Sequence, residues 1–559
     1  MSRIAAEYYL EALADHGIEY LFANPGTDFA PIVEAYARIA RTNRRVPKPM
    51  VVPHENAAVA MAHGYTVATG KPQAVMLHTN VGTANAINML INASRDRVPM
   101  LLTSGRTPFT ETGAEGSRSV HIHWSQEMFD QAGMLREVVK WDYEMKRGDQ
   151  AATTVDRAME IAQMSPQGPV YLSLPREVLG ETLEKPAESA IAHRARPQSP
   201  TPRREDVETL ADWIAAAKNP LIITGHLGRD PRDAVVLEHL ADKYALPVIP
   251  YMTRYYAIGG DHPMFFGSAP GTMLASADLV IVFDTDVPWI PSKQTPPAGC
   301  RIVQIGEDPL SSRLPMRSFP SDLTIKATCL SVLQGLDTAL ARREMPHLSE
   351  RRGRLVGESK TLQAKWAAEA EAAGSADTIT LPWLNHCLRA VIDENTKVVS
   401  EYSFLQEDCP LSTPGSLYAL SLAGGLGWGL GAAMGLKLAH PESLVVSVLG
   451  DGAYMFANPT ACHATARMQN LPTLTVVYNN ALYNAVRRAT LDMYAHGVAA
   501  EADGRFMAEL PTPAFEKIMA VHDGYGERVD VPSELPAALA RAAAAVRSGK
   551  QALVNVICR

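Results

Sequence analysis

SLVVSVLGDGAYMFANPTACHATARMQNLPTLTVVYNN, residues 443–480, contains the pattern that decides the fold. A β-rich run ends in GDG around Asp451, a helical stretch follows, and a second β-rich run ends in the pair Asn479-Asn480. Two strands joined through a helix run parallel, and strands that follow one another in the chain are usually neighbours. We therefore expect Asp451 and Asn480 to lie at adjacent strand ends.

The same alternation of short β-rich runs and helical stretches occurs in two other parts of the chain. Residues 18–104 include IEYLFA, AVMLH and VPMLLTS, and residues 205–310 include PLIITG, DLVIVFD and CRIVQI. This pattern is typical of doubly wound parallel sheets. Two stretches have the composition of linkers: residues 184–206 contain four prolines, and residues 341–360 are charged without an apolar period. The sequence predicts an α/β protein with three doubly wound parallel-sheet domains, at residues 1–185, 186–350 and 351–559.

Composition and charge exclude several other classes of protein. With 559 residues, 47% of them hydrophobic and 20% charged, the chain has ordinary globular composition and room for three or four folding units. A formal net charge of −8 without a long run of one sign argues against a nucleic acid partner. Six cysteines without a CxxC pair suggest neither a disulfide framework nor a zinc cluster. Together with a start that does not resemble a signal peptide, they favour a cytoplasmic location.

One segment is long enough to cross a bilayer, because residues 409–436 contain no charged side chain. Its glycines indicate a different environment. Gly427, Gly431 and Gly435 recur at every fourth position, which places them on one face of a helix. We expect a closely packed buried helix there, and no membrane partner.

Polar residues follow β-rich runs in both the first and the third domain. The first domain has NPGT ending at Thr27, HEN around Glu55 and HTNVGT beginning at His78. Ligands of doubly wound sheets bind at the carboxyl ends of the strands, so both domains are expected to present a polar rim. In the third domain, the Asp451 carboxylate and the Asn480 carbonyl suit Mg²⁺, which shares such oxygens with phosphate groups. A diphosphate ligand would complete this set.

GDG followed by a helix, a strand and NN resembles the thiamine diphosphate signature of the 2-oxo acid decarboxylase and acetohydroxyacid synthase superfamily. The resemblance covers the whole chain. VVPHENAAVAMAHGYTVATGKP, residues 51–72, matches the stretch that carries the activating glutamate of this family, here Glu55. IVQIGEDP, residues 302–309, is similar to its strand and Asp-Pro turn. The resemblance implies a pyrimidine-binding, a central and a diphosphate-binding domain, in this order.

The resemblance also implies roles for individual residues. Asp451, the Asn480 side chain and the backbone carbonyl of Leu482 would bind Mg²⁺. Leu426 matches the bulky residue that holds the cofactor in its bent form. Glu55 would hydrogen-bond the aminopyrimidine ring and favour the imino tautomer that takes the proton from C2. Further cofactor contacts are implied for Gly450, Gly452, Ala453 and Tyr483.

Among the subfamilies, the motifs are most similar to those of benzoylformate decarboxylase. LHTNVGTANA places His78 where that enzyme has an active-site histidine, and GDHPMFFG places His262 near its second one. Thr27 replaces the serine expected after NPG. His121 and His123 are similar to the paired histidines of pyruvate decarboxylase. We expect catalytic roles for Glu55, His78, His262, Thr27 and His123.

Other interpretations of these residues stay open. Glu55 could instead cap the helix that follows it, because carboxylates stabilise helix N-termini. His78 could be a core histidine whose hydrogen bonds are satisfied within the fold. His121, His123 and His262 cannot be brought to the cofactor by spacing alone.

The resemblance implies a non-oxidative, thiamine diphosphate- and Mg²⁺-dependent decarboxylase or carboligase of a 2-oxo acid, with an aldehyde as possible acceptor. The alternative is an acetohydroxyacid synthase, which often carries FAD on its central domain. FAD is possible but not favoured here. After NN the chain reads ALYNAVRR and lacks the Gln-Trp pair that is usual in the synthases.

Two further classes of function are disfavoured. A non-catalytic homologue would be expected to lose Glu55 or Asp451, and both are retained. An NAD-linked dehydrogenase needs a glycine fingerprint after a strand, which is missing. In the resembled family the activating glutamate comes from a partner subunit. We therefore expect a homodimer or a homotetramer.

Overall fold

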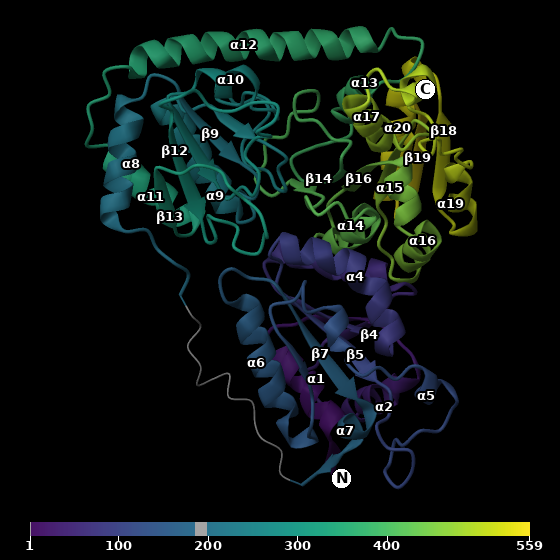
Figure 1. Cartoon of the computed structure of the whole chain (residues 1–559). Coiled ribbons are helices and arrows are strands. Elements are labelled where there is room, and N and C mark those ends of the chain that lie inside the picture. The colour runs from purple at the N-terminus through teal and green to yellow at the C-terminus, as the bar shows by residue number, and fades with distance from the viewer. Residues whose placement is uncertain (1, 185–197, 559) are drawn as a thin grey trace. The chain divides into compact units, whose positions relative to one another are not determined.

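The computed structural model describes residues 2–184 and 198–558, which form three parallel sheets with helices packed on them (Figure 1). The first sheet consists, in order, of β3 (Lys48–Val51), β2 (Tyr20–Asn24), β4 (Gln73–Leu77), β5 (Met100–Arg106), β7 (Pro169–Pro175) and β6 (Asp142–Glu144). The second consists of β10 (Val248–Pro250), β9 (Pro220–Thr224), β11 (Leu279–Phe283), β12 (Arg301–Gly306) and β13 (Leu323–Lys326). The third consists of β15 (Leu417–Ala419), β14 (Lys397–Glu401), β16 (Val445–Gly450), β17 (Leu474–Asn479), β19 (Ala552–Ile557) and β18 (Tyr525–Val529).

The strand pairs within these three sheets are all parallel. In each sheet the first strand in the chain lies between the next two, so the order reverses beside it. The prediction of an α/β fold with three doubly wound parallel sheets is confirmed. A short antiparallel pair, β1 (Arg3–Ile4) and β8 (Thr182–Leu183), lies outside them.

The first compact unit contains the first sheet together with residues 420–442 and 453–473. The central strand β4 is buried along its whole length, which agrees with its almost continuous apolar run. One face packs on α1 (Ala5–Asp15), α2 (Ala30–Ile39) and α6 (Ala151–Gln163). The helices α3 (Glu55–Thr69) and α4 (Thr79–Arg95) also pack against strands of this sheet.

The glycine-rich helix is α14 (Trp428–Ala439), and it packs on α3. A Cβ added at Gly431 would lie 2.4 Å from Cβ of Ala60, and one added at Gly435 would lie 2.2 Å from the Met61 carbonyl oxygen. These glycines therefore allow the two helices to touch along their backbones. The predicted close packing is confirmed, and it brings part of the third sequence domain into the first compact unit.

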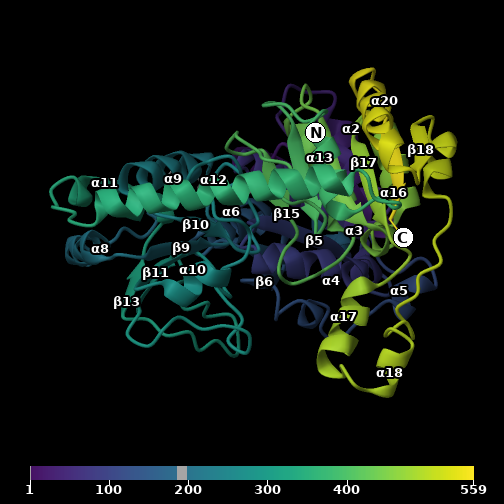
Figure 2. The ribbon, with the colours of Figure 1, turned by 90° about the horizontal axis from the view of Figure 1, so that it is seen from above.

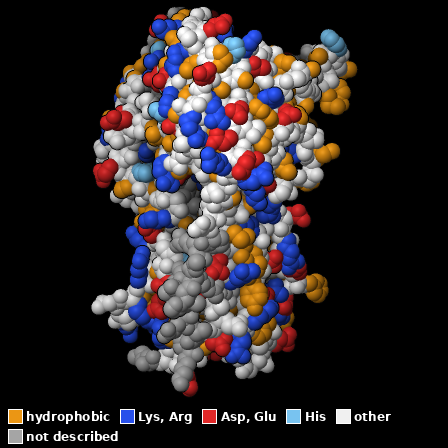
Figure 3. Space-filling view, turned by 90° about the vertical axis from the view of Figure 1, so that its left-hand side faces the viewer, with side chains coloured by type: hydrophobic (Ala, Val, Ile, Leu, Met, Phe, Trp, Pro, Cys, Tyr) orange, Lys and Arg blue, Asp and Glu red, His pale blue; other side chains and the backbone are white. Residues whose placement is uncertain are grey.

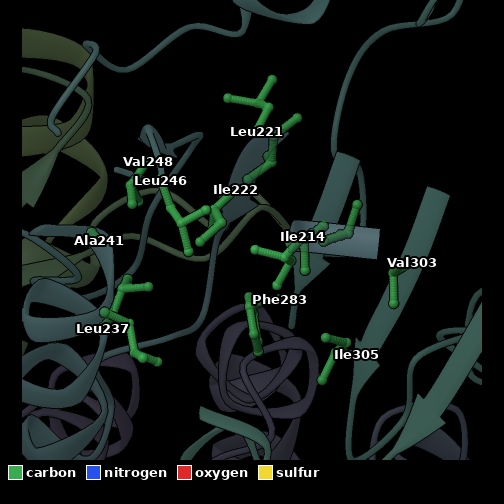
Figure 4. Close-up of a cluster of buried hydrophobic side chains, with 14 of the residues drawn as sticks. Ile214, Leu221, Ile222, Leu237, Ala241, Leu246, Val248, Phe283, Val303 and Ile305 are labelled. Carbon is green, nitrogen blue, oxygen red and sulfur yellow. The ribbon is translucent and has the colours of Figure 1, made fainter. Parts of the chain in front are cut away.

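The second compact unit contains residues 198–419, 443–452 and 474–558, and therefore the second and third sheets. Figure 4 shows the core of the second sheet, where Ile214 of α8 (Arg204–Ala216) and Leu237 of α9 (Pro231–Tyr244) lie among strand residues such as Ile222. The third sheet packs on α13 (Leu381–Leu388) and α20 (Leu535–Arg547).

The predicted linker at residues 341–360 is largely helical. The 26-residue helix α12 (Leu348–Ala373) begins inside it, so the prediction of an irregular linker was wrong there. Arg351, Leu355 and Ser359 are buried, and Leu355 belongs to the core of the second sheet. The helical period was hidden because two of these three buried residues are polar. The domain boundary at 185/186 lies outside the described residues, and that at 350/351 stays a prediction.

The surface of the protein agrees with its composition. On the face that Figure 3 shows, side chains of both charge signs are interspersed. None of the helices formed by residues 2–184 and 198–558 has both the length and the apolar character needed to cross a membrane.

Candidate active site

Glu55 is the first residue of α3, directly after β3, but it does not cap the helix. That role belongs to His54, whose Nδ1 accepts a hydrogen bond from the backbone N–H of Asn56 at 3.2 Å. The Glu55 carboxylate instead accepts a hydrogen bond from Nδ2 of Asn85 at 3.2 Å, and its side chain is only 12% exposed. The carboxylate is thus available for a role other than capping.

Three asparagines on one face of α4 connect Glu55 with the loop that carries Leu426. Asn85 binds Glu55, and Nδ2 of Asn88 donates to the Leu426 carbonyl oxygen at 3.1 Å. Asn92 donates to the Gly425 carbonyl oxygen at 2.7 Å and accepts from the Gly425 N–H at 3.0 Å. The first compact unit therefore connects Glu55, predicted to bind the aminopyrimidine ring, and Leu426, predicted to hold the cofactor in its bent form, to the same helix.

His78 precedes α4 at the end of β4, and its ring is paired on both sides. Nδ1 lies 2.5 Å from Oδ1 of Asp28, and Nε2 lies 3.3 Å from Nε2 of Gln126. The hydrogen bond to Asp28 is the largest cause that raises the pKa of His78, burial opposes it, and the charges of Asp28 and Glu55 raise the pKa further. The structure therefore gives His78 a charged partner instead of an apolar core environment.

Thr27 and His123 lie beside this group. Oγ1 of Thr27 is 3.5 Å from Nε2 of His123, and Nδ1 of His123 accepts the Ser119 N–H at 3.1 Å. Burial, followed by the positive charges of Arg176 and Arg118, lowers the pKa of His123. His123 is therefore suited to the neutral form beside Thr27. His121 is exposed to solvent.

Asp451 is the first residue of α15 (Asp451–Phe456) and is 3% exposed. Its Oδ1 accepts the Gly452 N–H at 2.8 Å, and its Oδ2 accepts the Ala481 N–H at 2.7 Å. Burial raises the pKa of Asp451, and backbone N–H groups partly offset this effect. Across residues 2–184 and 198–558 no cationic side chain pairs with Asp451, so its charge is held by N–H groups alone.

The turn after β17 holds the other predicted metal ligands against Asp451. Ala481 has a φ of +54°, and Oδ1 of Asn480 accepts the Leu482 N–H at 2.9 Å. β16 and β17 are parallel neighbours, with Gly450 paired to Tyr478. The prediction that Asp451 and Asn480 lie at adjacent strand ends is therefore confirmed.

The remaining residues of the GDG motif differ in their surroundings. A Cβ at Gly450 would meet no atom within 4 Å, so this glycine faces open space. A Cβ at Gly452 would lie 3.0 Å from the ring of Tyr483. Ala453 is buried and belongs to the first compact unit. An open surface above a glycine suits a ligand that approaches the backbone closely.

The chain beyond Tyr483 forms a long loop whose two ends are hydrogen-bonded at the turn that is predicted to bind the metal. The Tyr483 N–H donates to Ala508, and the Leu510 N–H donates to Ala481. Between them, α17 (Asn484–Met493) and α18 (Val498–Glu501) bury no residue and project from the third sheet (Figure 2). No catalytic residue was predicted in this segment.

His262 belongs to the second compact unit, where its Nδ1 accepts the Met264 N–H at 3.0 Å. Burial lowers the pKa of this histidine. The hydrogen bond stabilises a turn, and the structure does not bring His262 together with the other predicted site residues of that unit through any described contact.

Asp451 and Asn480 fit the Mg²⁺ and diphosphate that the sequence predicted. A buried carboxylate without a cationic partner, beside an amide oxygen, suits one hard divalent cation that also binds phosphate. No group of three or more His, Cys, Asp or Glu side chains forms a metal site in the described parts of the chain, so an all-protein cage is not formed there.

Comparison with protein families identifies all three domains. Residues 3–134 match the N-terminal TPP binding domain of thiamine pyrophosphate enzymes, residues 207–336 match their central domain, and residues 401–556 match their C-terminal TPP binding domain. The chain belongs to the thiamine pyrophosphate enzyme family. The resemblance inferred from the GDG and NN motifs is confirmed, and the matched domains support thiamine diphosphate as the cofactor.

Similar members of this thiamine pyrophosphate enzyme family include both decarboxylases and synthases. The chain is 26% identical to benzoylformate decarboxylase of Pseudomonas aeruginosa over 495 residues, which covers 85% of this chain and 86% of that protein. It is 24% identical to the acetolactate synthase large subunit of Haemophilus influenzae over 563 residues, covering 96% and 91%. The solved benzoylformate decarboxylase of Polynucleobacter necessarius has a TM-score of 0.80 at 20% identity, covering 100% of this chain and 98% of that one, which shows a common fold.

Sequence reasoning missed the residues that position the predicted ones. Asp28 and Gln126 flank His78, and the three asparagines of α4 bind Glu55 and the Leu426 loop. The sequence did contain one signal for the asparagines. They occur at spacings of three and four residues, which place them on one face of a helix. Nothing in the local sequence pairs Asp28 with His78.

Proposed function

We propose that this protein is a thiamine diphosphate- and Mg²⁺-dependent decarboxylase or carboligase of a 2-oxo acid. The observation that carries the proposal is the environment of the Glu55 carboxylate. Its carboxylate is mostly buried, takes no part in capping α3 and is oriented by Asn85. A non-catalytic homologue would have no use for an acid held in this way.

The proposed site residues have two tasks, which are cofactor binding and chemistry on the substrate. Asp451, Asn480 and the carbonyl of Leu482 would hold Mg²⁺ and with it the diphosphate, while Leu426 supports the bent cofactor. Bound thiamine diphosphate would supply a nucleophilic carbon and a sink for the electron pair that stays on the substrate when CO₂ leaves. The carboxyl oxygen of Glu55 would hold a proton for hydrogen bonding to the pyrimidine ring. His78 carries a proton at Nε2, and Thr27 and His123 bind the substrate carboxylate and carbonyl.

An acetohydroxyacid synthase is the second candidate, because the similarity to an acetolactate synthase extends over 96% of the chain. Such an enzyme would transfer the group left after decarboxylation to a second 2-oxo acid, whereas the favoured enzyme protonates it or transfers it to an aldehyde. Bound FAD would favour the synthase. The flavin absorbance of the purified protein separates the two candidates.

The experiment that tests the proposal is a screen of aliphatic and aromatic 2-oxo acids with thiamine diphosphate and Mg²⁺. CO₂ release, aldehydes and hydroxyketones are measured together, with Glu55→Gln as the inactive control. We expect cofactor-dependent CO₂ release with aldehyde as product. If wild type and Glu55→Gln release CO₂ equally slowly from every acid while both bind the cofactor, the proposed activity is wrong.

The proposal includes self-assembly. We infer a homodimer, paired again as a homotetramer, because the family that the chain resembles places its activating glutamate in the partner subunit. The mixing experiment in the Discussion tests this inference separately from the activity.

A further inference from the structure

The buried Asp28 and the partly buried His78 form a pair that the proposed function does not yet use. Asp28 lies in the short helix η1 (Thr27–Phe29), is 2% exposed and is 50 positions from His78 in the sequence. Its Oδ1 lies 2.5 Å from Nδ1 of His78, and its Oδ2 accepts the Thr79 N–H at 3.3 Å. One carboxylate therefore contacts both the histidine ring and the backbone of the next residue.

Two glycines provide the space that this pair occupies. A Cβ at Gly26 would lie 2.1 Å from Nδ1 of His78, and a Cβ at Gly105 would lie 1.7 Å from Oδ2 of Asp28. Gly26 has extended backbone, and neither glycine is among the residues with positive φ. Other residues could adopt the backbone conformations of Gly26 and Gly105. Glycine is therefore needed at these positions because any side chain would collide with His78 or Asp28. The two glycines thus leave the space in which Asp28 and His78 make contact.

The other nitrogen of His78 faces the side-chain amide of Gln126, whose oxygen can accept a hydrogen bond. Nε2 lies 3.3 Å from the amide nitrogen of Gln126, and the buried Oε1 of Gln126 has no hydrogen-bond partner among the described residues. Turning this amide over would place Oε1 as an acceptor for an Nε2–H group. Amide orientation follows the hydrogen-bond network, so this arrangement satisfies both side chains when His78 is protonated at both nitrogens.

The charged groups around His78 come from three elements. Asp28 in η1 and Glu55 in α3 are negative, and His123 in α5 (Ile122–Ser125) is the third titratable neighbour. Around His123 lie Arg118, Arg176 and Glu177. Asp28 and Glu55 both raise the pKa of His78, and the hydrogen bond with Asp28 is the largest contribution.

We propose that Asp28 is a positioning residue that fixes the His78 ring and keeps it protonated, so that the Nε2–H group beside Gln126 is the proton donor to the substrate. This inference rests on the proposed function. Conversion of a 2-oxo acid anion to an aldehyde and CO₂ consumes one proton per turnover. The Nε2–H bond breaks, a C–H bond forms on the substrate carbon that has lost CO₂, and neutral His78 regains a proton from water. Nδ1 of His78 keeps its proton throughout, hydrogen-bonded to Asp28. A carboxylate orients a catalytic histidine in the same way in other enzymes.

The test compares Asp28→Asn with a matched control. His16 and Asp156 form a second buried pair in the same unit, with Nε2 2.9 Å from Oδ1, and they are outside the site. We expect Asp28→Asn to move the high-pH limb of kcat/KM to lower pH and to lower kcat at pH 8 at least tenfold. The KM for thiamine diphosphate should stay within about twofold. Asp156→Asn should leave the position of the limb unchanged, and an equal shift in both variants would overturn the proposal.

A second measurement does not depend on turnover. Histidine ¹³C NMR of the protein without substrate follows the His78 ring, with its signal assigned by its absence in His78→Gln. We expect a pKa above the ordinary value of about 6.5 in wild type and a lower one in Asp28→Asn. A wild-type value at or below about 6.5 would overturn the proposal even if Asp28→Asn does not fold. If His78 titrates as expected while no 2-oxo acid is decarboxylated, the proposed function fails and the pairing stands.

Discussion

Asn92 and Gly425 are joined by two hydrogen bonds, one in each direction, although 333 positions separate them in the sequence. The amide of Asn92 donates to the Gly425 carbonyl oxygen and accepts from the Gly425 N–H. A buried backbone segment that is not part of a helix or sheet must find such partners elsewhere. The loop before α14, and with it Leu426, is thereby held on α4.

Replacing Asn92 with Ala should loosen this loop. Both polar groups of Gly425 lose their partners, at a cost of about 1–3 kcal/mol for each buried group that stays unsatisfied. We expect a lower Tm and weaker thiamine diphosphate binding by calorimetry, with larger effects than in the exposed control Asn395→Ala. Unchanged cofactor affinity at a lowered Tm would mean that the loop is structural only.

Replacing Gly435 with Ala should destabilise the protein through α14. The new Cβ would lie 2.2 Å from the Met61 carbonyl oxygen, so the helix backbones must separate. Overpacking of this kind costs roughly 1–3 kcal/mol. The matched control is Gly357→Ala in α12, where a Cβ meets no atom within 4 Å and a gain of about 0.5–1 kcal/mol is expected. Thermal unfolding should show opposite signs for the two variants, and equal Tm values would contradict the packing described.

Replacing Glu55 with Gln should keep the fold and cofactor binding but slow proton exchange at C2 of thiamine diphosphate. The amide preserves the hydrogen bond with Asn85 and cannot share a proton with the pyrimidine ring. Loss of such proton transfer lowers rates by roughly 10²–10⁴-fold. Deuterium exchange at C2, measured by NMR after acid quench, gives the answer, with exposed Glu34→Gln as control. Exchange at the wild-type rate would exclude Glu55 as the activator.

Binding of Mg²⁺ should be sensitive to mild acid because of Asp451. Burial raises the pKa of this carboxyl, so the folded protein binds the proton more tightly than the unfolded chain does. The metal-free protein therefore loses stability as the pH rises through the interval between the unfolded and the higher folded pKa. Mg²⁺ competes with the proton, so its stabilising effect should grow over the same interval.

The measurement is the increase in Tm that Mg²⁺ and thiamine diphosphate cause between pH 4.5 and 8. We expect the increase to become larger with pH in wild type and to be small at every pH in Asp451→Ala. An increase of wild-type size in the variant would remove Asp451 from the proposed metal site.

Mixing two inactive variants tests the proposed assembly. Glu55→Gln and Asp451→Ala each remove one end of the proposed site, and a homodimer that shares its sites would regain one intact site in each mixed dimer. We expect activity above that of either variant after subunit exchange, verified by mass spectrometry of differently tagged chains. Verified exchange without recovery would show that both residues act within one chain.

The sequence by itself determined the sheet type and the family, and it predicted the main site residues. Strands with continuous apolar runs must be buried on both faces, and Asp451 and Asn480 directly follow two such strands. This information is local, because a strand, its turn and the next residue are consecutive in the chain. Asp451 and Asn480 could therefore be placed at adjacent strand ends before the structure was known.

The tertiary structure alone decided which residues support that site. Nothing near Asp28 indicates His78, and nothing near Asn92 indicates Gly425, because these partners meet only after separate elements have packed. The same holds for the first half of α12, where two of the three buried residues, Arg351 and Ser359, are polar, so the sequence shows no apolar period there. Spacing along the chain predicts which residues share one face of a helix or strand. Which element packs against that face depends on how all the helices and strands bury their apolar surfaces together. Packing between distant segments therefore fixed the positions of His78 and Leu426, the one through Asp28 and the other through α4.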